Sequence, residues 1–248
     1  MRLVSFPGLV LVVAAAFGSG CGGGGESTVA AGGLPQGSEQ SHVAPAEFTV
    51  AIDNPYWPAR PGNRWVYREV EAGGTVKRDV VTVTGRTKMI ADGVEARVVH
   101  DVATEHGRPA EVTDDWYAQD SAGNVWYLGE QTTEYENGRA VSSEGSWEAG
   151  VDGAQPGVIM PARPRTGQAY RQEFYAGEAE DSARVLSTEE QVQVPFGHFG
   201  SAVLTKETSP LEPRVVEYKL YAPNVGEAMA MDVSGESDRE ELISFTRR

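Results

Sequence analysis

Carboxylates and tryptophans recur together in the middle of this 248-residue chain. They fall around one predicted strand pair, in a Gly-rich segment that follows, and in a later hairpin. Two carboxylates flanking a glycosidic bond can hydrolyse it while an aromatic ring stacks on the sugar. Several carboxylate oxygens in a loop can bind Ca²⁺. The candidates are Asp115, Asp120, Glu130, Glu148, Asp152, Glu178 and Asp181, with Trp116, Trp126 and Trp147 as aromatic contacts.

Neither chemistry has a diagnostic spacing in the sequence, which contains no EF-hand loop. The chain has 36 acidic against 21 basic residues and a net charge of −15. A chain this acidic presents groups of carboxylates on its solvated face by default. We therefore expect solvated surface or structural pairing at these positions and no cofactor. Calcium binding and polysaccharide hydrolysis are the alternatives.

Other catalytic and metal-binding patterns are also missing from the sequence. The histidines beyond the N-terminal region are His100, His106 and His198, and no GxSxG motif accompanies them. The chain has no HExxH and no CxxC, the spacings typical of zinc sites. The sequence thus predicts no catalytic residue and no metal site, and it favours a protein without enzymatic activity.

The N-terminus has the order of a secretory signal, with Arg2, an apolar run and then small residues. Cys21, the single cysteine, follows Gly-Ser-Gly, and GSGC resembles the bacterial lipobox. That resemblance implies cleavage of residues 1–20 and lipidation of Cys21, as by palmitate. Gly18 stands where the motif usually has an aliphatic residue. The alternative is an ordinary cleaved signal with an incidental cysteine.

The predicted lipid anchor and the net negative charge of the mature chain limit the classes of partner that we expect. Removing residues 1–20 takes away one arginine and no acid, so the net charge changes from −15 to −16. Such a chain is repelled by nucleic acid and by anionic head groups. We expect no nucleic-acid partner. The predicted location is the bacterial cell envelope, where the N-terminal lipid would anchor the protein at the periplasmic face or the cell surface.

Composition divides the mature chain into two regions. Residues 21–47 are rich in Gly, Ser, Ala and Pro and predict a flexible tether. Residues 48–248 contain short runs of Val, Thr, Tyr and Trp that alternate at period two, as in 80–84 and 191–194. Asn137-Gly138 between two such runs is a strong hairpin signal. The fold class is therefore predicted to be all-β.

The second region contains a four-residue sequence, here called the repeated word, that occurs twice. Pro-Ala-Arg-Pro occurs at 58–61 and at 161–164, and each copy lies six residues ahead of a Tyr-Arg. Shifted by 104, Tyr117-Ala118 falls on Tyr221-Ala222. Agreement at distant blocks predicts an internal duplication. We expect two tandem antiparallel β-meanders, about 57–144 and 160–248.

The two meanders are expected to form one domain. Each would have an apolar face with nothing to cover it, so we expect them to pack as a single barrel-like or sandwich domain. Residues 145–159 should form the loop that joins them, with Trp147 packed onto the body as a plug.

Four longer words carry a family resemblance. DWYAQD (115–120), GNVWYLGE (123–130), GSWEAGVDGAQPG (145–157) and YAGEAED (175–181) resemble an uncharacterised group of exported bacterial proteins and lipoproteins. The resemblance covers most of residues 54–230. It implies a secreted bacterial domain and no particular reaction.

The sequence favours a lipoprotein whose β domain binds a ligand or a partner. An inward face lined by Trp, Tyr and Val would suit a small apolar molecule or another envelope protein. The alternatives are a carboxylate-based hydrolase acting on polysaccharide and a purely structural envelope protein. The oligomeric state is left open.

Overall fold

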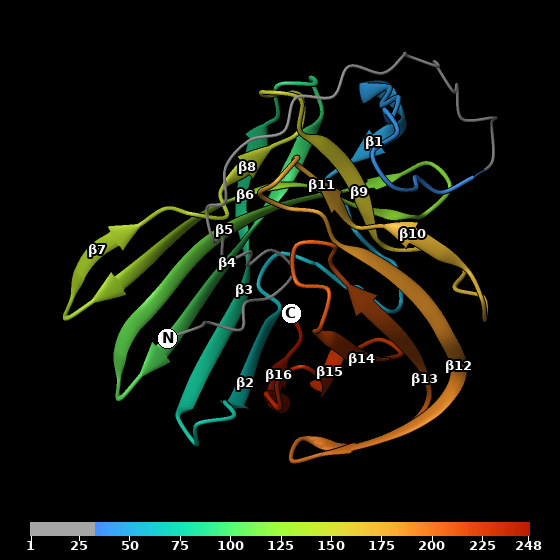
Figure 1. Cartoon of the computed structure of the whole chain (residues 1–248). Helices are drawn as coiled ribbons and strands as arrows, with labels where there is room; N and C mark the ends of the chain where they lie inside the picture. The colour runs from blue at the N-terminus through green and yellow to red at the C-terminus, as the bar shows by residue number, and fades with distance from the viewer. Residues whose placement is uncertain (1–32) are drawn as a thin grey trace.

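The computed structural model describes residues 33–248, in which almost all regular structure is antiparallel β-sheet (Figure 1). The predicted all-β, barrel-like class is confirmed. The first elements are the 3-10 turn Pro45–Glu47 and the short strand β1 (Phe48–Thr49). No helix within the described range is long and apolar enough to cross a membrane. The signal region and Cys21 lie outside the described residues.

The first wall of the barrel is a meander in which each strand pairs with the next. Burial alternates along β3 in particular, as expected for a strand with one face inside. Asn137 and Gly138 both have positive φ, 52° and 76°, at a tight turn, so the predicted hairpin is confirmed. The strands are β2 (Arg64–Val70), β3 (Val76–Met89), β4 (Glu95–Glu105), β5 (Arg108–Asp120), β6 (Val125–Glu136) and β7 (Arg139–Ser142).

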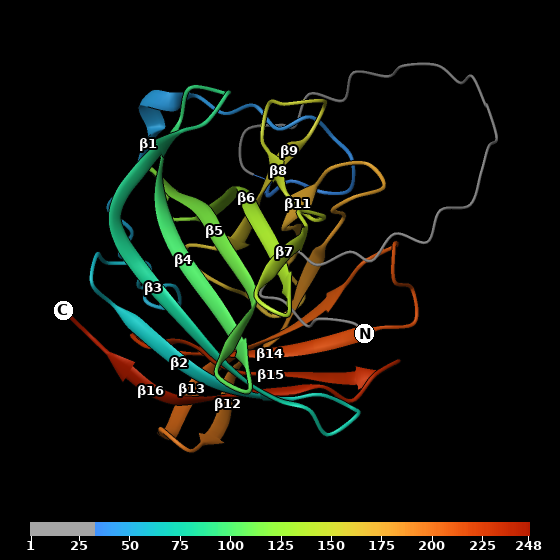
Figure 2. The ribbon, with the colours of Figure 1, turned by 90° about the vertical axis from the view of Figure 1, so that its left-hand side faces the viewer.

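The second wall is another meander, which closes against the first. Its last strand, β16, pairs with β2, so both meanders belong to one continuous sheet. Figures 1 and 2 show the teal and green strands on one side of the barrel and the orange and red strands on the other. The strands are β10 (Ala169–Arg171), β12 (Ser182–Val194), β13 (Gly197–Thr208), β14 (Val216–Ala222), β15 (Gly226–Ser234) and β16 (Arg239–Thr246).

The segment between the walls is not the loop that the sequence predicts. It contains β8 (Trp147–Glu148) and β9 (Gln155–Met160), and both pair with β6. The run 156–160 is buried on both faces, so the period-two signal of a half-exposed strand is missing there. Trp147 is 4% exposed, which confirms that it packs onto the body.

The two ends of the strand path meet through a single residue. The path begins at β10 and ends at β11 (Glu173–Phe174), and only Gln172 separates these strands along the chain. Gly157 of β9 lies against this junction. A Cβ atom at Gly157 would sit 2.2 Å from the Gln172 carbonyl oxygen. The barrel therefore closes where glycine lets two backbones approach.

Residues 33–47 are not a free tether, which corrects that part of the predicted 21–47 linker. They run along the seam between β9 and β10, and we call them the strap. Arg171, 1% exposed, donates from its guanidinium to the carbonyl oxygens of Gly37 (2.9 Å) and Glu39 (2.6 Å). It also donates to Ser41 and to the Pro156 carbonyl oxygen. A polar composition concealed these long-range bonds.

The repeated word precedes the first strand of each meander. Residues 58–61 lead into β2 and residues 161–164 lead into β10. Tyr67 and Tyr170, which follow the two copies, are 2% and 1% exposed. The common origin of the two meanders stays a prediction.

Changing Gly157 to Ala should destabilise the barrel. The added methyl group would meet backbone atoms of Arg171 and Gln172, which cannot move like a flexible side chain. We expect the free energy of unfolding to fall by about 2–3 kcal/mol, as for overpacked interiors, in a denaturant titration. Gly85→Ala in β3, where a Cβ has nothing within 4 Å, is the matched control. Equal stability of the two variants would contradict the close-approach role.

Candidate functional site

Cross-strand register places a set of carboxylates on one face of the sheet. Residues directly opposite each other on antiparallel strands share a face. Tyr67 lies opposite Asp79, and Asp115 lies opposite Glu130. This face encloses the barrel interior. Its carboxylates, each at most 8% exposed, form what we call the acidic lining: Glu69, Asp79, Asp101, Glu111, Asp115, Glu130, Glu173, Glu207, Glu227 and Glu240.

Few basic side chains among the described residues accompany the lining. Lys219 lies 3.3 Å from Glu207 and 3.2 Å from Glu217. Lys77 pairs with Glu71 and lies 4.0 Å from Glu69. The buried arginines, Arg97 and Arg171, direct guanidinium N–H groups to backbone carbonyl oxygens instead. Negative charge on the lining is thus only partly balanced within residues 33–248.

Three members of the lining are each held by one donor. The Tyr127 hydroxyl donates to Asp115 (2.8 Å), Thr132 donates to Glu130 (3.2 Å), and the Trp147 indole donates to Glu173 (3.0 Å). The second oxygens of Glu130 and Glu173 are buried without a hydrogen-bond partner. Buried acceptors left in this state are costly unless a donor or a cation reaches them.

Burial disfavours the ionised form of these carboxyl groups and so raises their pKa values. Desolvation raises the pKa of Asp115 to about 7, and neighbouring carboxylates add to the effect of burial. Desolvation likewise raises the pKa of Glu227 to about 7, although the nearby Lys219 opposes the shift. Desolvation also raises the pKa of Glu69 to about 8, against the opposing effect of Lys77. The pKa values of Glu130 and Glu173 are also raised well above their ordinary range by burial.

Two aspartates on neighbouring strands are hydrogen-bonded to each other. Burial raises the pKa of Asp79 and of Asp101, and the bond between their side chains favours a proton on Asp101. Such a bond requires one protonated carboxyl group, because two ionised carboxylates would repel each other. The two carboxyl groups therefore titrate as a coupled pair whose pKa values lie above their ordinary range.

A small cavity lies inside the acidic lining. Its volume is about 40 Å³, several times the 10–15 Å³ that one water molecule needs. Three carboxylates, Asp101, Asp115 and Glu227, border it. The remaining wall is mainly aromatic and aliphatic and includes Trp57, Pro58, Ala59, Trp65, Tyr67, Val81, Val83, Val99, Tyr117 and Gly226.

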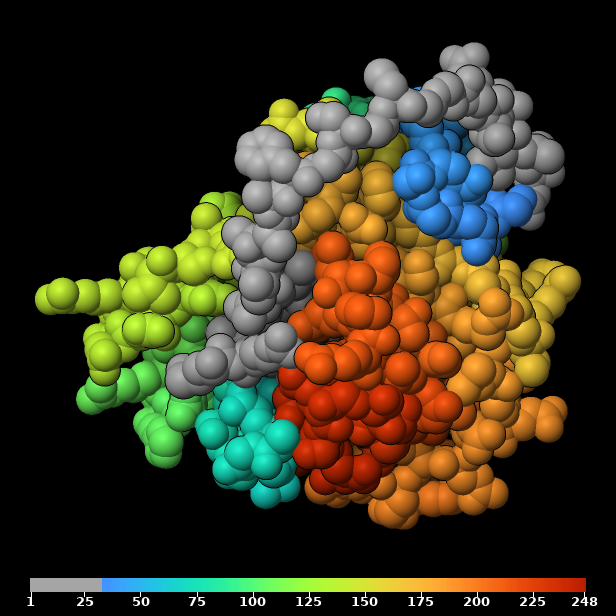
Figure 3. Space-filling model, in the orientation of Figure 1, coloured from blue at the N-terminus to red at the C-terminus, as the bar shows by residue number. Residues whose placement is uncertain are grey.

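A larger, open hollow lies at the tips of the hairpins. Its volume is about 620 Å³, and residues from the β2–β3, β4–β5 and β6–β7 turns line it. Figure 3 shows these turns projecting beside the orange and red second meander. Four glutamates and two basic side chains, Lys77 and Arg108, line this hollow, so basic groups balance part of its negative charge.

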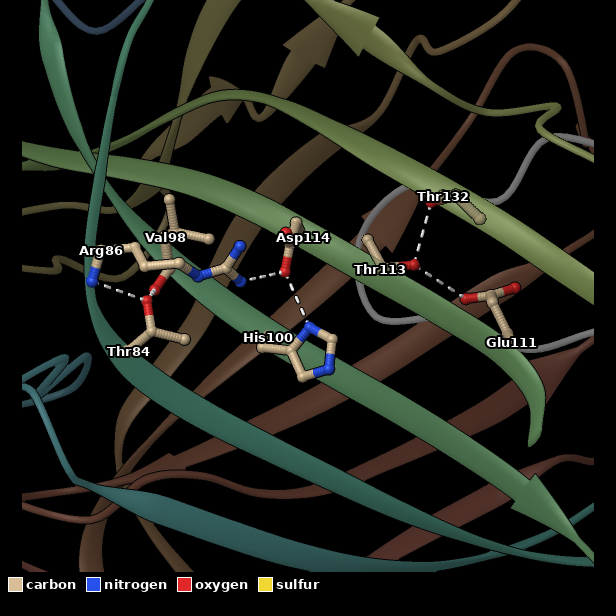
Figure 4. Close-up of polar contacts among 8 residues, drawn as sticks. All are labelled: Thr84, Arg86, Val98, His100, Glu111, Thr113, Asp114 and Thr132. Atoms are coloured by element: carbon tan, nitrogen blue, oxygen red, sulfur yellow. Dashed lines mark hydrogen bonds and ion pairs between the residues drawn. The ribbon is translucent and has the colours of Figure 1, made fainter. Parts of the chain in front are cut away.

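The outer face of the first wall carries a separate polar group (Figure 4). Arg86 and His100 both reach Asp114 at 2.7 Å. Burial acts to raise the pKa of Asp114, but the bonds from Arg86 and His100 outweigh it and lower that pKa. Thr84 donates its hydroxyl to the Val98 carbonyl oxygen (2.7 Å) and is not paired with His100. The group resembles a structural ion pair more than a nucleophile with its base.

The structure brings together only some of the predicted site residues. Asp115 and Glu130 face each other inside the barrel, which corrects the expectation of a solvated surface for them. Asp181 is near the seam, where burial raises its pKa to about 6. Asp152 is exposed and Glu178 half-buried, both in turns.

The other predicted residues have structural contacts. Asp120 accepts bonds from the Asn124 backbone and from the Trp126 indole, which fixes the β5–β6 turn. Glu148 accepts from the Ala91 N–H (2.9 Å) and pairs with Lys88 (2.9 Å). Trp116 lies beneath the Lys88 ammonium at 4.0 Å. These contacts are the structural pairing that the sequence predicted.

Most of the acidic lining was missed from the sequence. The sequence signal that could have found it is the alternation of residues along each strand. Glu69 follows Trp65 and Tyr67 at every second position, so it lies on their buried face. Asp79 has the same relation to Val81 and Val83 in β3. An acid in phase with apolar residues indicates a buried carboxylate.

Stability should fall as pH rises from 5 to 8. The folded pKa values of Asp115 and Glu227, about 7, exceed their ordinary 3.8 and 4.5, so the folded chain holds more protons than the unfolded chain in this range. Asp115→Asn should reduce the slope of unfolding free energy against pH by up to about 1.4 kcal/mol per pH unit. The measurement is denaturant unfolding at several pH values. Asp152→Asn, at an exposed turn, should keep the wild-type slope; stability that rises with pH would refute the expectation.

Comparison with known proteins identifies similar structures but no family. No protein-family model matches the chain, and no curated protein matches it. One similar structure is a protein described as exported, with a YmcC-like fold, from Bacteroides fragilis. It is 15% identical, covers 77% of this chain and 99% of its own, and has a TM-score of 0.44. A second, described as a lipoprotein, comes from Parabacteroides distasonis. It is 13% identical, covers 77% and 98%, and has a TM-score of 0.42.

Proposed function

We propose that this chain is an exported, lipid-anchored protein of the bacterial envelope whose barrel binds a positively charged ligand without chemical reaction. The observation that carries the proposal is the acidic lining. It has two ion-paired lysines among the described residues and several buried oxygens without partners. A bound cation would satisfy these oxygens and relieve the repulsion among them.

The interior fits a charged ligand better than the apolar ligand expected from the sequence. An apolar molecule in the cavity would leave the second carboxylate oxygen of Glu227 buried and unsatisfied. The polysaccharide hydrolase is less well supported by the geometry. The cavity of about 40 Å³ is far smaller than the 300–1,000 Å³ of ordinary ligand pockets, so a sugar ring does not fit between the carboxylates.

The envelope location is supported by the sequence. The order of positive, apolar and small residues before Cys21 is that of an export signal, and an exported lone cysteine at the cleavage point suits a lipid anchor. The strap then limits how far the barrel can lie from that anchor. Its seam contacts begin at Leu34 and Pro35, so the part of the predicted 21–47 tether from residue 34 onward is held against the barrel.

Cys21→Ser should remove the anchor. In a bacterial host, we expect the wild-type chain in the membrane fraction with a lipid mass on residue 21, and the variant in the soluble exported fraction. Mass spectrometry of the mature N-terminus makes the measurement. Ser19→Ala serves as the control, since it retains a small residue beside the cleavage site. An unmodified, soluble wild-type N-terminus would exclude the anchor.

Cations should stabilise the folded barrel more than matched sodium chloride does. We would measure the melting temperature of the full chain at pH 8, above the pKa of about 7 of Asp115 and Glu227, with calcium, magnesium, spermidine and methylammonium salts at equal ionic strength. A ligand at 100 times its dissociation constant adds about 2.7 kcal/mol, a shift of a few degrees at least. Phosphate at equal ionic strength is the anionic control. If every cation matched sodium, the proposed function would be wrong.

A further inference from the structure

The geometry points to the cavity between Asp101, Asp115 and Glu227 as a site for the ammonium group of an organic ligand. This inference rests on the proposed function and specifies where the cation binds and of which chemical class it is. Three carboxylates border the cavity, and aromatic rings form much of the remaining wall. Carboxylates attract the charge of an ammonium group, and ring faces attract its polarised N–H and C–H groups.

Two of the N–H and O–H donors that line the cavity are directed at backbone carbonyl oxygens. The Trp65 indole donates away, to the Val225 carbonyl oxygen (2.6 Å), and the Tyr67 hydroxyl donates to the Glu227 carbonyl oxygen (3.0 Å). One Glu227 carboxylate oxygen is buried without a partner, and Glu227 is 4% exposed. The cavity therefore has an unsatisfied carboxylate oxygen, and an ammonium group would supply the missing donor.

Aromatic packing gives the cavity its walls. Trp57 lies 5.3 Å from Tyr117 and 6.1 Å from Tyr221, measured between ring centroids, and its ring is tilted to both of them. Tyr117 stacks on Tyr127 at 4.9 Å. Trp57 is half-buried whereas the others are buried, so it is the ring at the solvent side of the cavity. A cation entering beside Trp57 would meet ring faces first and carboxylates behind them.

The second meander shows how this barrel holds an ammonium group. Lys219 places its ammonium between Glu207 and Glu217, and the Tyr221 hydroxyl donates to Glu207 (3.2 Å). Lys219 precedes Tyr221-Ala222 by two residues. In the first meander, Asp115 precedes Tyr117-Ala118 by the same two residues. One wall thus has a built-in ammonium where the other has a carboxylate, and a ligand would supply the missing cation.

The composition of the wall favours an organic ammonium over a metal ion. Calcium takes six to eight oxygen ligands, and magnesium requires near-ideal octahedral geometry. The cavity offers three carboxylates, and most of its other lining residues are Trp, Tyr, Val, Pro and Ala. A volume of about 40 Å³ suits a compact head group such as methylammonium. The longer part of the ligand would extend past Trp57.

Methylammonium chloride is the probe that tests the site. On the wild-type full chain at pH 8, we expect a saturable rise in melting temperature and a saturable change in tryptophan emission, because Trp57 and Trp65 line the cavity. Potassium chloride at equal ionic strength should give neither. Asp115→Asn and Glu227→Gln should each weaken methylammonium binding at least tenfold. Asp238→Asn removes a buried carboxylate that belongs neither to the acidic lining nor to the cavity wall, and it should keep the affinity within twofold.

The possible outcomes separate this inference from the proposed function. If calcium stabilises the chain and methylammonium does not, the cation-binding function stands and the ammonium site is wrong. If methylammonium binds equally to the Asp115 and Glu227 variants, the site lies elsewhere. If no cation binds, both proposals fail. Should a variant not fold, the wild-type emission change decides, since its absence at saturating methylammonium overturns the site.

Discussion

The desolvation of carboxylates is the constraint on which the rest of this barrel depends. An ionised carboxylate loses far more on leaving water than an ordinary hydrogen bond returns. Hydroxyl and indole groups offset part of this cost by donating hydrogen bonds to single carboxylate oxygens. They belong to Tyr127, Thr132 and Trp147. Protons retained at neutral pH lessen the remaining charge. Replacing buried charged groups with apolar ones is often neutral or stabilising, so the acidic lining is not needed for the stability of the fold.

Closure of the barrel makes this interior possible. An open sheet with the same strands would leave the acidic face in water, where the acids would ionise at ordinary pH. The β16–β2 pairing and the Gln172 junction close the sheet on either side. The strap covers the seam, where Arg171 collects carbonyl oxygens that the short strands leave without a partner strand. Strap, seam and lining therefore depend on one another.

Local sequence signals predicted the secondary-structure elements better than the long-range contacts between them. Period-two patterns and the Asn137-Gly138 turn predicted an all-β chain, and Trp147 was expected to pack inward. The acidic lining escaped prediction because alternation shows which residues share a face, but not that both walls direct that face into a closed interior. The strap escaped because its order comes from Arg171, more than 120 residues away in the chain. Contacts of such sequence separation leave no local pattern.

The pairing of β16 with β2 has a consequence for biogenesis. It joins residues 239–246 to residues 64–70, which are about 170–180 positions apart in the chain. A chain emerging from its N-terminus presents the β2 edge long before its partner strand arrives. Until then, an unpaired strand edge is open to association with other chains. The whole polypeptide must therefore be available before the barrel closes, and a truncated or stalled chain would be a target for chaperones and proteases.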